Sequence, residues 1–173
     1  MNDMTDTIAS AVVPDFRKAM RRLAATVTLI STIDASGRRH GMAATAVNSV
    51  TMDPPTLLIC VNQTASLHAP LIERGRFCIN VLMPAHHELV GRFSGQKSGE
   101  DRFDAGDWRI EGTSGLPYLH GAQCNLFCRI ESVTAVGTHS VIIAAVETVQ
   151  VHDDVMPLIY ANGRLHAVGD VVS

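Results

Sequence analysis

The chain has 173 residues, a formal net charge of −3, 46% hydrophobic residues and 18% charged residues. Such a length and composition predict one soluble domain with its own core. The small negative charge excludes a general attraction to nucleic acid, and no apolar run approaches the roughly 20 residues that span a bilayer. We expect no nucleic-acid or membrane partner, and the acidic N-terminus, unlike a secretory signal, favours a cytoplasmic location.

The N-terminal region divides at Pro14. Residues 1–13 lack periodicity and are expected to form a disordered or loosely docked arm. From Phe16 onward, apolar residues recur at helical spacing with a basic opposite face, which predicts an amphipathic helix of about three turns. The basic face could steer a phosphate-bearing ligand, but most such faces are only solvated. We assign residues 14–168 to a single domain and residues 169–173 to a C-terminal tail.

Most of the remaining chain is predicted to be extended. Alternating side chains over 26–32, a turn at 34–37 and a strand from Gly41 predict a hairpin. Helices are expected before Gly75 and over 84–93. Residues 94–108 are expected to form a long surface loop, which we call the surface excursion. Further strands are expected at 56–61, 77–82, 123–136, 139–151 and 157–160, the last closed by the turn signal Asn162-Gly163. About eight strands in hairpin order predict a mainly β fold, a barrel with a few short helices at its rim.

The stretch from Gly41 to Asn62, GMAATAVNSVTMDPPTLLICVN, is the most informative part of the sequence. It is predicted to form two extended segments joined at 53–55. The first segment carries Ala, Thr, Asn and Ser where a core strand would carry bulky branched side chains, so it leaves room for a ligand. Its hydroxyl and amide groups suit a flat, phosphate-tailed cofactor, although the same residues also occur in strands that face solvent. Asn62 and Ser66 could close the same pocket, or serve only as turn and cap residues.

Other candidate residues carry weaker signals. His139 begins an apolar strand at a hairpin end, where it could face a cavity mouth or serve as a structural histidine. Arg102 lies in Asp101-Arg102-Phe103, which could form a surface ion pair, a loop anchor that shapes the pocket, or a subunit contact. The four cysteines lie among apolar residues and are predicted to be buried free thiols, and no histidine pair makes a credible metal site. The dinucleotide, P-loop, zincin and hydrolase-elbow motifs are missing from the sequence.

In order along the chain, several stretches together resemble the short-chain flavin reductase family, the reductase components of two-component flavin-dependent monooxygenases. They span about residues 16–160 and read FRKAMRRLAATVTLIST, GMAATAVNSVTMDPPTLLICVNQTASLHAPLIERGRFCINVL, FSGQKSGEDRF, GLPYLHGAQCNLFCRI, GTHSVIIAAV and PLIY. The resemblance implies an FMN-binding split β-barrel, usually a homodimer, that reduces flavin with NADH or NADPH. FAD is a possible alternative flavin.

The resemblance also implies site residues. His139 matches a family histidine beside the nicotinamide and the flavin, and is the expected catalytic residue. The expected cofactor-binding residues are Ala43, Ala44, Thr45, Ala46, Ser49, Val50, Asn62, Ser66, Phe93, Ser94, Arg102 and Tyr160. Two positions depart from the family pattern, since Ala43 replaces a frequent Thr and Thr138 a frequent Asp.

We therefore expect an NAD(P)H-dependent FMN reductase that supplies reduced flavin to a separate monooxygenase. Because positioning of the nicotinamide against the flavin can supply most of the acceleration, no covalent nucleophile is required. The departures at Ala43 and Thr138 leave open a flavin-binding carrier or sensor of the same fold with little turnover. A related split-barrel oxidase acting on a small molecule is a more distant possibility.

Overall fold

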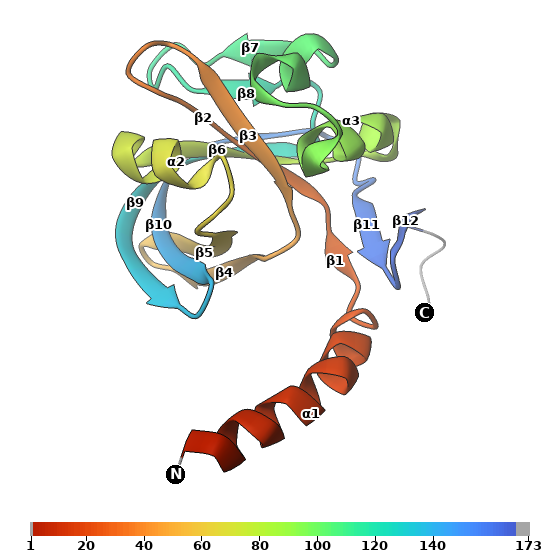
Figure 1. Cartoon of the computed structure of the whole chain (residues 1–173). Coiled ribbons are helices and arrows are strands. Elements are labelled where there is room, and N and C mark those ends of the chain that lie inside the picture. Colours follow the sequence, from red (N-terminus) through yellow and green to blue (C-terminus); the bar gives the residue numbers. More distant parts are fainter. Residues whose placement is uncertain (1, 169–173) are drawn as a thin grey trace.

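Seven antiparallel strands form the main sheet, in the order β3-β2-β6-β9-β10-β5-β4 (Figure 1). The computed structural model describes residues 2–168, with side chains from residue 11, so the predicted tail at 169–173 lies outside the described residues. The strands are β2 (Thr28–Ile33), β3 (Arg39–Ala44), β4 (Val47–Met52), β5 (Pro55–Asn62), β6 (Arg76–Val81), β9 (Cys124–Val136) and β10 (His139–Val151). The predicted β2–β3 hairpin is confirmed.

The two edge strands of this sheet, β3 and β4, follow one another in the chain. Only Thr45 and Ala46 separate them, and the three peptide units from Ala44 to Val47 span at most about 11 Å. The sheet must therefore curl until its two edges meet, which gives a barrel with a split between β3 and β4. The prediction of one continuous segment from Gly41 to the turn at 53–55 is wrong, because the chain crosses from one edge of the sheet to the other inside it. The split-barrel prediction is confirmed.

Two small sheets flank the barrel. The strands β1 (Ala25–Thr26), β11 (Leu158–Ala161) and β12 (Arg164–Ala167) form the first, and β7 (Trp108–Ile110) pairs with β8 (Pro117–Leu119) in the second. Asn162 and Gly163 have φ angles of 49° and 80°, so the predicted turn is confirmed. The chain forms β12 beyond this turn, so the expectation that the last strand ends at Tyr160 is wrong.

Short helices cover the rim of the barrel (Figure 1). They are α2 (His68–Arg74), η1 (Pro84–His86), α3 (His87–Gly91), η2 (Arg92–Gln96) and η3 (Gly99–Asp104). Gly75 ends α2 with a φ of 68°, which confirms that predicted stop. Leu67, not Ser66, occupies the N-cap position of α2. No helix in the described part of the chain combines the length and hydropathy needed to cross a bilayer.

The N-terminal helix differs from its prediction. Helix α1 runs from Asn2 to Met20, so Pro14 lies inside it and does not begin it. A proline inside a helix removes one backbone hydrogen bond, and its ring crowds the carbonyl four residues earlier, but its fixed φ is helical, so the helix continues through Pro14 at a cost in stability. The division of the chain into an arm and a domain at Pro14 stays a prediction. Figure 1 shows α1 leading away from the barrel beyond β1.

The core has two main parts, one on each face of β2. Ile30, Ile59 and Ile79 are fully buried inside the barrel. Leu29, the neighbour of Ile30, points to the other face and packs under α3 and η3 with Leu82. Because both faces of β2 are covered, this strand is apolar or hydrogen-bonded along most of its length.

A buried polar network joins the barrel to β8. The Asn80 amide on β6 donates to the Leu29 carbonyl (2.8 Å) and to Ser31 Oγ (3.0 Å). Its Oδ1 accepts from the Leu119 N–H (2.7 Å) and from Asn125 Nδ2 (2.9 Å). Every polar atom of the Asn80 side chain is therefore bonded, which satisfies the requirement for burying it. The network holds β8 against three strands of the barrel.

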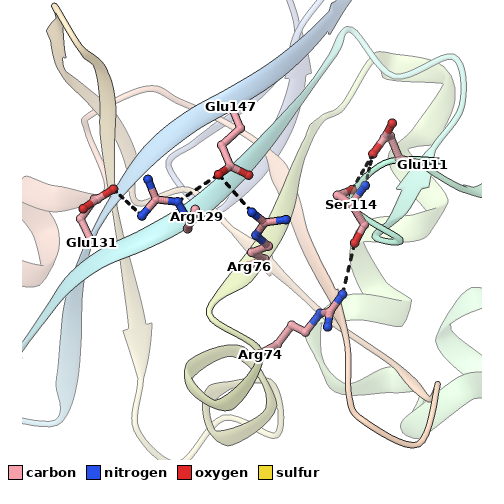
Figure 2. Close-up of polar contacts among 7 residues, drawn as sticks. All are labelled: Arg74, Arg76, Glu111, Ser114, Arg129, Glu131 and Glu147. Atoms are coloured by element: carbon pink, nitrogen blue, oxygen red, sulfur yellow. Dashed lines mark hydrogen bonds and ion pairs between the residues drawn. The ribbon is translucent and has the colours of Figure 1, made fainter.

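Ion pairs cross the outer face of the sheet (Figure 2). Glu147 on β10 accepts from Arg129 Nε on β9 (3.0 Å) and from Arg76 Nη2 on β6 (3.3 Å), and Arg129 also pairs with Glu131 (2.8 Å). The same view shows contacts between the end of α2 and the turn before β8. These groups are partly exposed, so each pair contributes about 0–1 kcal/mol.

The four cysteines are free thiols, as predicted, but the prediction that all four are buried is wrong for Cys60 and Cys124. Cys78 and Cys128 are buried, whereas Cys60 and Cys124 are half-buried. Burial raises the pKa of Cys128 to about 12 and also raises the pKa of Cys78 and of Cys124. Because the thiolate is the reactive form, Cys78, Cys124 and Cys128 are chemically quiet packing residues.

Candidate functional site

A cavity of about 240 Å³ lies at the end of β3, where the chain leaves the main sheet toward β4. We call it the site cavity. Four separate segments supply its walls: the link between β1 and β2, the end of β3 with the residue after it, the α3–η2 helices and β11. The lining residues are Val27, Ala43, Ala44, Thr45, Val90, Ser94 and Tyr160.

The cavity exists because the end of β3 carries small side chains. Ala43 and Ala44 leave the space that Val, Ile or Leu would fill, and Thr28 Oγ1 on the neighbouring strand donates to the Ala44 carbonyl (2.8 Å) to hold this edge in place. On the opposite wall, Ser94 is followed by Gly95 with a φ of 110°. This angle favours glycine, so Gly95 allows the chain to turn directly after Ser94.

An aromatic cluster supports the wall that carries Ser94. The Phe93 ring lies 5.1 Å from the Phe103 ring and 5.4 Å from the Trp108 ring, measured between centroids. Arg39 lies over the Phe103 ring at 4.7 Å, so the cluster also fixes the surface excursion to β3. Gly41 permits the close approach of β3, because a Cβ there would lie 2.6 Å from a ring carbon of Phe93.

Arg102 anchors the surface excursion to β3 and to the loop before α2. Its Nη1 donates to the Gly41 carbonyl (2.8 Å) and to Ser66 Oγ (3.1 Å), and its Nε donates to the Lys97 carbonyl (3.0 Å). Among the described ion pairs, none joins Arg102 to Asp101, so the loop-anchor alternative is the one the structure supports. Two predicted cofactor-binding residues, Ser66 and Arg102, are thereby in direct contact.

An ion pair between Arg39 and Glu100 also holds the surface excursion, close in sequence to Arg102. Glu100 accepts from Arg39 Nε (2.7 Å) and from the Arg39 backbone N–H. Burial raises the pKa of Glu100, but these hydrogen bonds and the nearby positive charges outweigh burial and leave its pKa below the ordinary value. Glu100 is therefore held as a carboxylate, and the excursion is fixed at both Glu100 and Arg102.

His139 and Asn62 are brought together at the other end of the barrel wall. They are opposite one another in the β10–β5 ladder, and Gln63 N–H donates to the Thr138 carbonyl (3.0 Å). Thr138 Oγ1 lies 2.9 Å from His139 Nδ1, and the imidazole is exposed. The Thr that replaces the expected Asp thus still makes a hydrogen bond to this ring.

The predicted site residues therefore fall into separate groups. Ala43, Ala44, Thr45, Ser94 and Tyr160 line the site cavity. A series of hydrogen bonds connects the other predicted residues. Arg102 donates to the Gly41 carbonyl and to Ser66 Oγ. Next to Ser66, the Ala65 N–H donates to the carbonyl of Asn62 (3.0 Å), which lies opposite His139.

The remaining predicted residues lie outside this series. Phe93 is 3% exposed and packs in the aromatic cluster. Ala46 accepts from the Cys60 N–H (3.2 Å) across the strands. Ser49 lines a different hollow on β4, and Val50 beside it is exposed. Direct contact of these four residues with a cofactor stays a prediction.

Two cavity residues were missed by the sequence reasoning. Val27 reaches the cavity from the link between β1 and β2, and Val90 reaches it from α3. Val90 carried a partial signal, since its spacing on the predicted helix placed it inward. Val27 carried none, because a valine in an alternating strand pattern is ordinary core.

The site residues do not form a metal centre. In the part of the chain that the structure describes, no group of three or more His, Cys, Asp or Glu side chains is arranged to hold a metal ion. The site cavity itself is lined by aliphatic, hydroxyl and phenol groups. Its chemistry suits a flat organic group better than a cation.

Comparisons with known proteins agree with this arrangement. The family described as flavin reductase like domain matches residues 20–169. The chain is 44% identical over 149 residues to an FMN reductase (NADH) RutF of Methylorubrum populi, which covers 86% of this chain and 73% of that protein. It is 42% identical to the 4-hydroxyphenylacetate 3-monooxygenase reductase component of Pseudomonas aeruginosa, over 87% of this chain and 89% of that protein.

A solved structure shares the fold. The NADH:FAD oxidoreductase SgcE6 of Streptomyces globisporus, in complex with NAD and FAD fragments, superposes with a TM-score of 0.82 at 26% identity, covering 89% of this chain and 91% of that chain. The matched family range includes every strand of the barrel and every residue of the site cavity. The chain therefore belongs to the flavin reductase like domain family.

Proposed function

We propose that this chain is an NADH-dependent FMN reductase that supplies reduced flavin to a separate monooxygenase. One observation carries the proposal: this chain belongs to the flavin reductase like domain family and has a cavity lined by small side chains and hydroxyl groups where its barrel splits. The names of the relatives, an FMN reductase (NADH) and a monooxygenase reductase component, support the choice of flavin, hydride donor and recipient.

The lining of the site cavity fits a flavin ring. Val27 and Val90 supply apolar walls for its faces, Thr45 and Ser94 supply hydroxyl groups for its polar edge, and Ala43 leaves the room. The volume of about 240 Å³ lies below the range of about 300–1,000 Å³ for small-molecule pockets. The cavity can therefore hold only part of a flavin nucleotide, and the rest must lie outside it.

The contacts that lead away from the cavity suit the rest of the nucleotide. Arg102 offers a guanidinium and Ser66 a hydroxyl, which are groups that bind phosphate without a strongly basic surface. The dinucleotide FAD is a larger alternative that the same groups could bind. We also propose NADPH as a second hydride donor, and comparison of its oxidation with that of NADH tests this.

The bound flavin would supply the hydride acceptor, and this chain's residues would supply orientation and shelter from water. Val27 and Val90 would keep water from the bound ring, and the hydroxyl groups of Thr45 and Ser94 would help to orient it. Holding two reactants at near-contact distance accounts for most of the acceleration expected, so no acid or nucleophile is needed. His139, with Nδ1 engaged by Thr138, would orient a ligand through its other ring nitrogen.

We further propose that the protein is a homodimer located in the cytoplasm. Large apolar side chains exposed on α1 and β4 support the dimer, because monomeric proteins rarely expose contiguous apolar patches.

Steady-state oxidation of NADH and of NADPH, each with FMN, FAD or riboflavin, tests the function. We expect nucleotide oxidation only when a flavin is present, with NADH and FMN preferred. The proposal fails if neither nucleotide is oxidised with any flavin. Tight flavin retention on gel filtration together with negligible turnover would instead indicate a carrier or sensor.

A variant tests the role of His139. His139→Ala is expected to lower the turnover of NADH more than the affinity for flavin, because the imidazole lies outside the site cavity. His120→Ala changes an equally exposed histidine elsewhere and serves as the control. Equal turnover in His139→Ala and the wild type would remove His139 from the mechanism.

A further inference from the structure

Helix α1 exposes a continuous apolar stripe. Phe16 and Leu23 are each 60% exposed, Val12 is 55% exposed, and Met20 is 42% exposed. Spacings of three and four residues place Val12, Phe16 and Met20 on one helix face, and Leu23 follows in the next turn. An amphipathic helix normally buries its apolar face. In the described part of the chain, the side chains of this stripe are instead exposed.

Packing of its apolar face would stabilise the helix. Pro14 removes one hydrogen bond from the helix interior, and in proteins most of the stability of a helix comes from packing of its amphipathic face. The C-terminal end of α1 is fixed to the body, because the Asn162 N–H donates to the Arg21 carbonyl (2.7 Å). From this point α1 leads away from the barrel, as Figure 1 shows.

An apolar groove on the barrel is the second exposed surface. It has a volume of about 300 Å³ and lies between β4, β5, β9 and β10. Six large apolar residues line it: Val47, Met52, Leu57, Leu126, Val146 and Val149. At its rim Met52 is 78% exposed and Val149 is 48% exposed. Among the residues of α1 whose side chains the structure describes, from residue 11 onward, none lines this groove, so the stripe and the groove of one chain do not cover one another.

We propose that α1 of a second copy of this chain occupies the groove, and that the two copies exchange their helices. The inference deepens the homodimer proposed above. The strand that forms one side of the groove, β4, has six residues and is about 20 Å long at 3.3 Å per residue. The stripe from Val12 to Met20 is about 13 Å long at 1.5 Å per residue, so it fits along β4.

Charges on the two surfaces are complementary. The polar side of the helix and its extension carries Arg17, Arg21 and Arg22. Asp53 follows Met52 directly at one end of the groove, and Asp153 comes two residues after the end of β10. A basic helix laid in the apolar groove would have acidic side chains within reach of its flanks.

The occupant is a second copy and not a different protein, because one chain carries both complementary surfaces. A symmetric pair then covers two stripes and two grooves at once, and the assembly closes without leaving either surface free. A different partner that covered only α1 would leave the groove exposed. The docked helix would also pack against β4. This strand follows directly after Ala46, next to Thr45 of the site cavity.

The mass of the protein in solution tests the exchange. We expect the full chain to have twice the chain mass of 18.6 kDa in sedimentation and light scattering. Phe16→Glu on the stripe and Val149→Glu in the groove should each shift it to the monomer. Ile110→Glu is the matched control, because Ile110 is 55% exposed but lies on β7, outside both surfaces. Circular dichroism and Trp108 emission verify that each variant is folded.

Several outcomes overturn the proposal. A dimer that survives both Phe16→Glu and Val149→Glu would show that another surface joins the copies. A monomeric wild type would remove the dimer as well. Neither result bears on the reductase function, since flavin-dependent NADH oxidation is measured separately on the same samples.

A photo-cross-link identifies the occupant. Benzoylphenylalanine is placed at position 16, and the variant is mixed with isotopically labelled wild-type chain before irradiation. We expect adducts between the two isotopic forms within residues 47–57 or 126–149. Adducts within one chain, or adducts to any other segment, would contradict the exchange. Adducts to an added monooxygenase at the expense of the second copy would assign the stripe to that partner instead.

Discussion

Two hollows flank the residues from Ala43 to Met52, and they differ in what lines them. The site cavity before the crossing combines alanines with hydroxyl groups and a tyrosine from four segments of the chain. The groove after the crossing is lined mainly by large apolar side chains of four paired strands. Small side chains with hydroxyl groups suit a flat polar ligand, whereas an apolar groove suits a helix face. Two adjoining strands of the same barrel are therefore suited to two different partners.

The difference arises at Thr45 and Ala46. These two residues carry the chain from one edge of the sheet to the other, so the side chains before and after them lie on different edge strands and meet different neighbours. Variants on the two sides should therefore separate flavin kinetics from assembly.

Filling the site cavity should have the largest effect. Ala43→Leu is expected to lower kcat/KM for FMN about 10- to 100-fold, because overpacking costs about 1–3 kcal/mol and each 1.4 kcal/mol is a factor of ten. The mass in solution should not change. Ala35→Leu, in the exposed turn at the other end of β3, is the control. Unchanged flavin kinetics in Ala43→Leu would show that the flavin does not use this cavity.

Gly41→Ala should mainly affect stability. A Cβ at Gly41 would lie 2.6 Å from the buried Phe93 ring and 3.2 Å from the Ile30 carbonyl, so the aromatic cluster must move. We expect a loss of about 1–3 kcal/mol of unfolding free energy, or about 2–4 °C in Tm per kcal/mol. Gly112→Ala, where a Cβ would meet open space, should change Tm little. Similar Tm values for the two variants would contradict the predicted clash.

Replacing the loop anchor should have a smaller, kinetic effect. Arg102→Lys keeps the charge but loses the planar guanidinium, whose Nη1 donates to Gly41 and Ser66 while its Nε donates to Lys97. We expect about a tenfold lower kcat/KM for FMN, since hydrogen bonds to charged groups contribute about 1.5–3 kcal/mol when sheltered and less here. Trp108 emission should shift with the excursion. Arg109→Lys, at an arginine paired with its neighbour Asp107 (2.7 Å), is the control, and equal kinetics in the two variants would exclude an anchoring role.

The smallest effect concerns the pH dependence of stability. His86 lies in η1, directly before helix α3, which carries Val90 of the site cavity. Burial lowers the pKa of His86 below its ordinary value of 6.5. Below about pH 6.5 the unfolded state therefore binds more protons than the folded state, so this contribution to stability is present above that pH and is lost as the pH falls through the folded-state pKa. His86→Gln should reduce the Tm difference between about pH 7.5 and about pH 5.5. His87 is exposed, so His87→Gln should leave this Tm difference unchanged. An equal Tm difference in the two variants would show that His86 is not its source.

Some of the molecule could be predicted from local sequence. The hairpin of β2 and β3, the stop of α2 at Gly75 and the turn at Asn162-Gly163 follow from patterns within about ten residues, which local propensities determine. The start of α1 could not be predicted in this way, because residues 1–13 show no periodic pattern and Pro14 favours a helix start.

The sequence by itself determined that small side chains from Ala43 leave room for a ligand, and the motif series determined the family. Only the tertiary structure decided that Ala43 and Ser49 lie in different hollows, that Val27 and Val90 complete the site cavity, and that Arg102 anchors the excursion. The physical reason is that a side chain's size is local, whereas its neighbours depend on pairing across the barrel. In this chain, the crossing at Thr45 and Ala46 separates residues that the sequence presents as one strand.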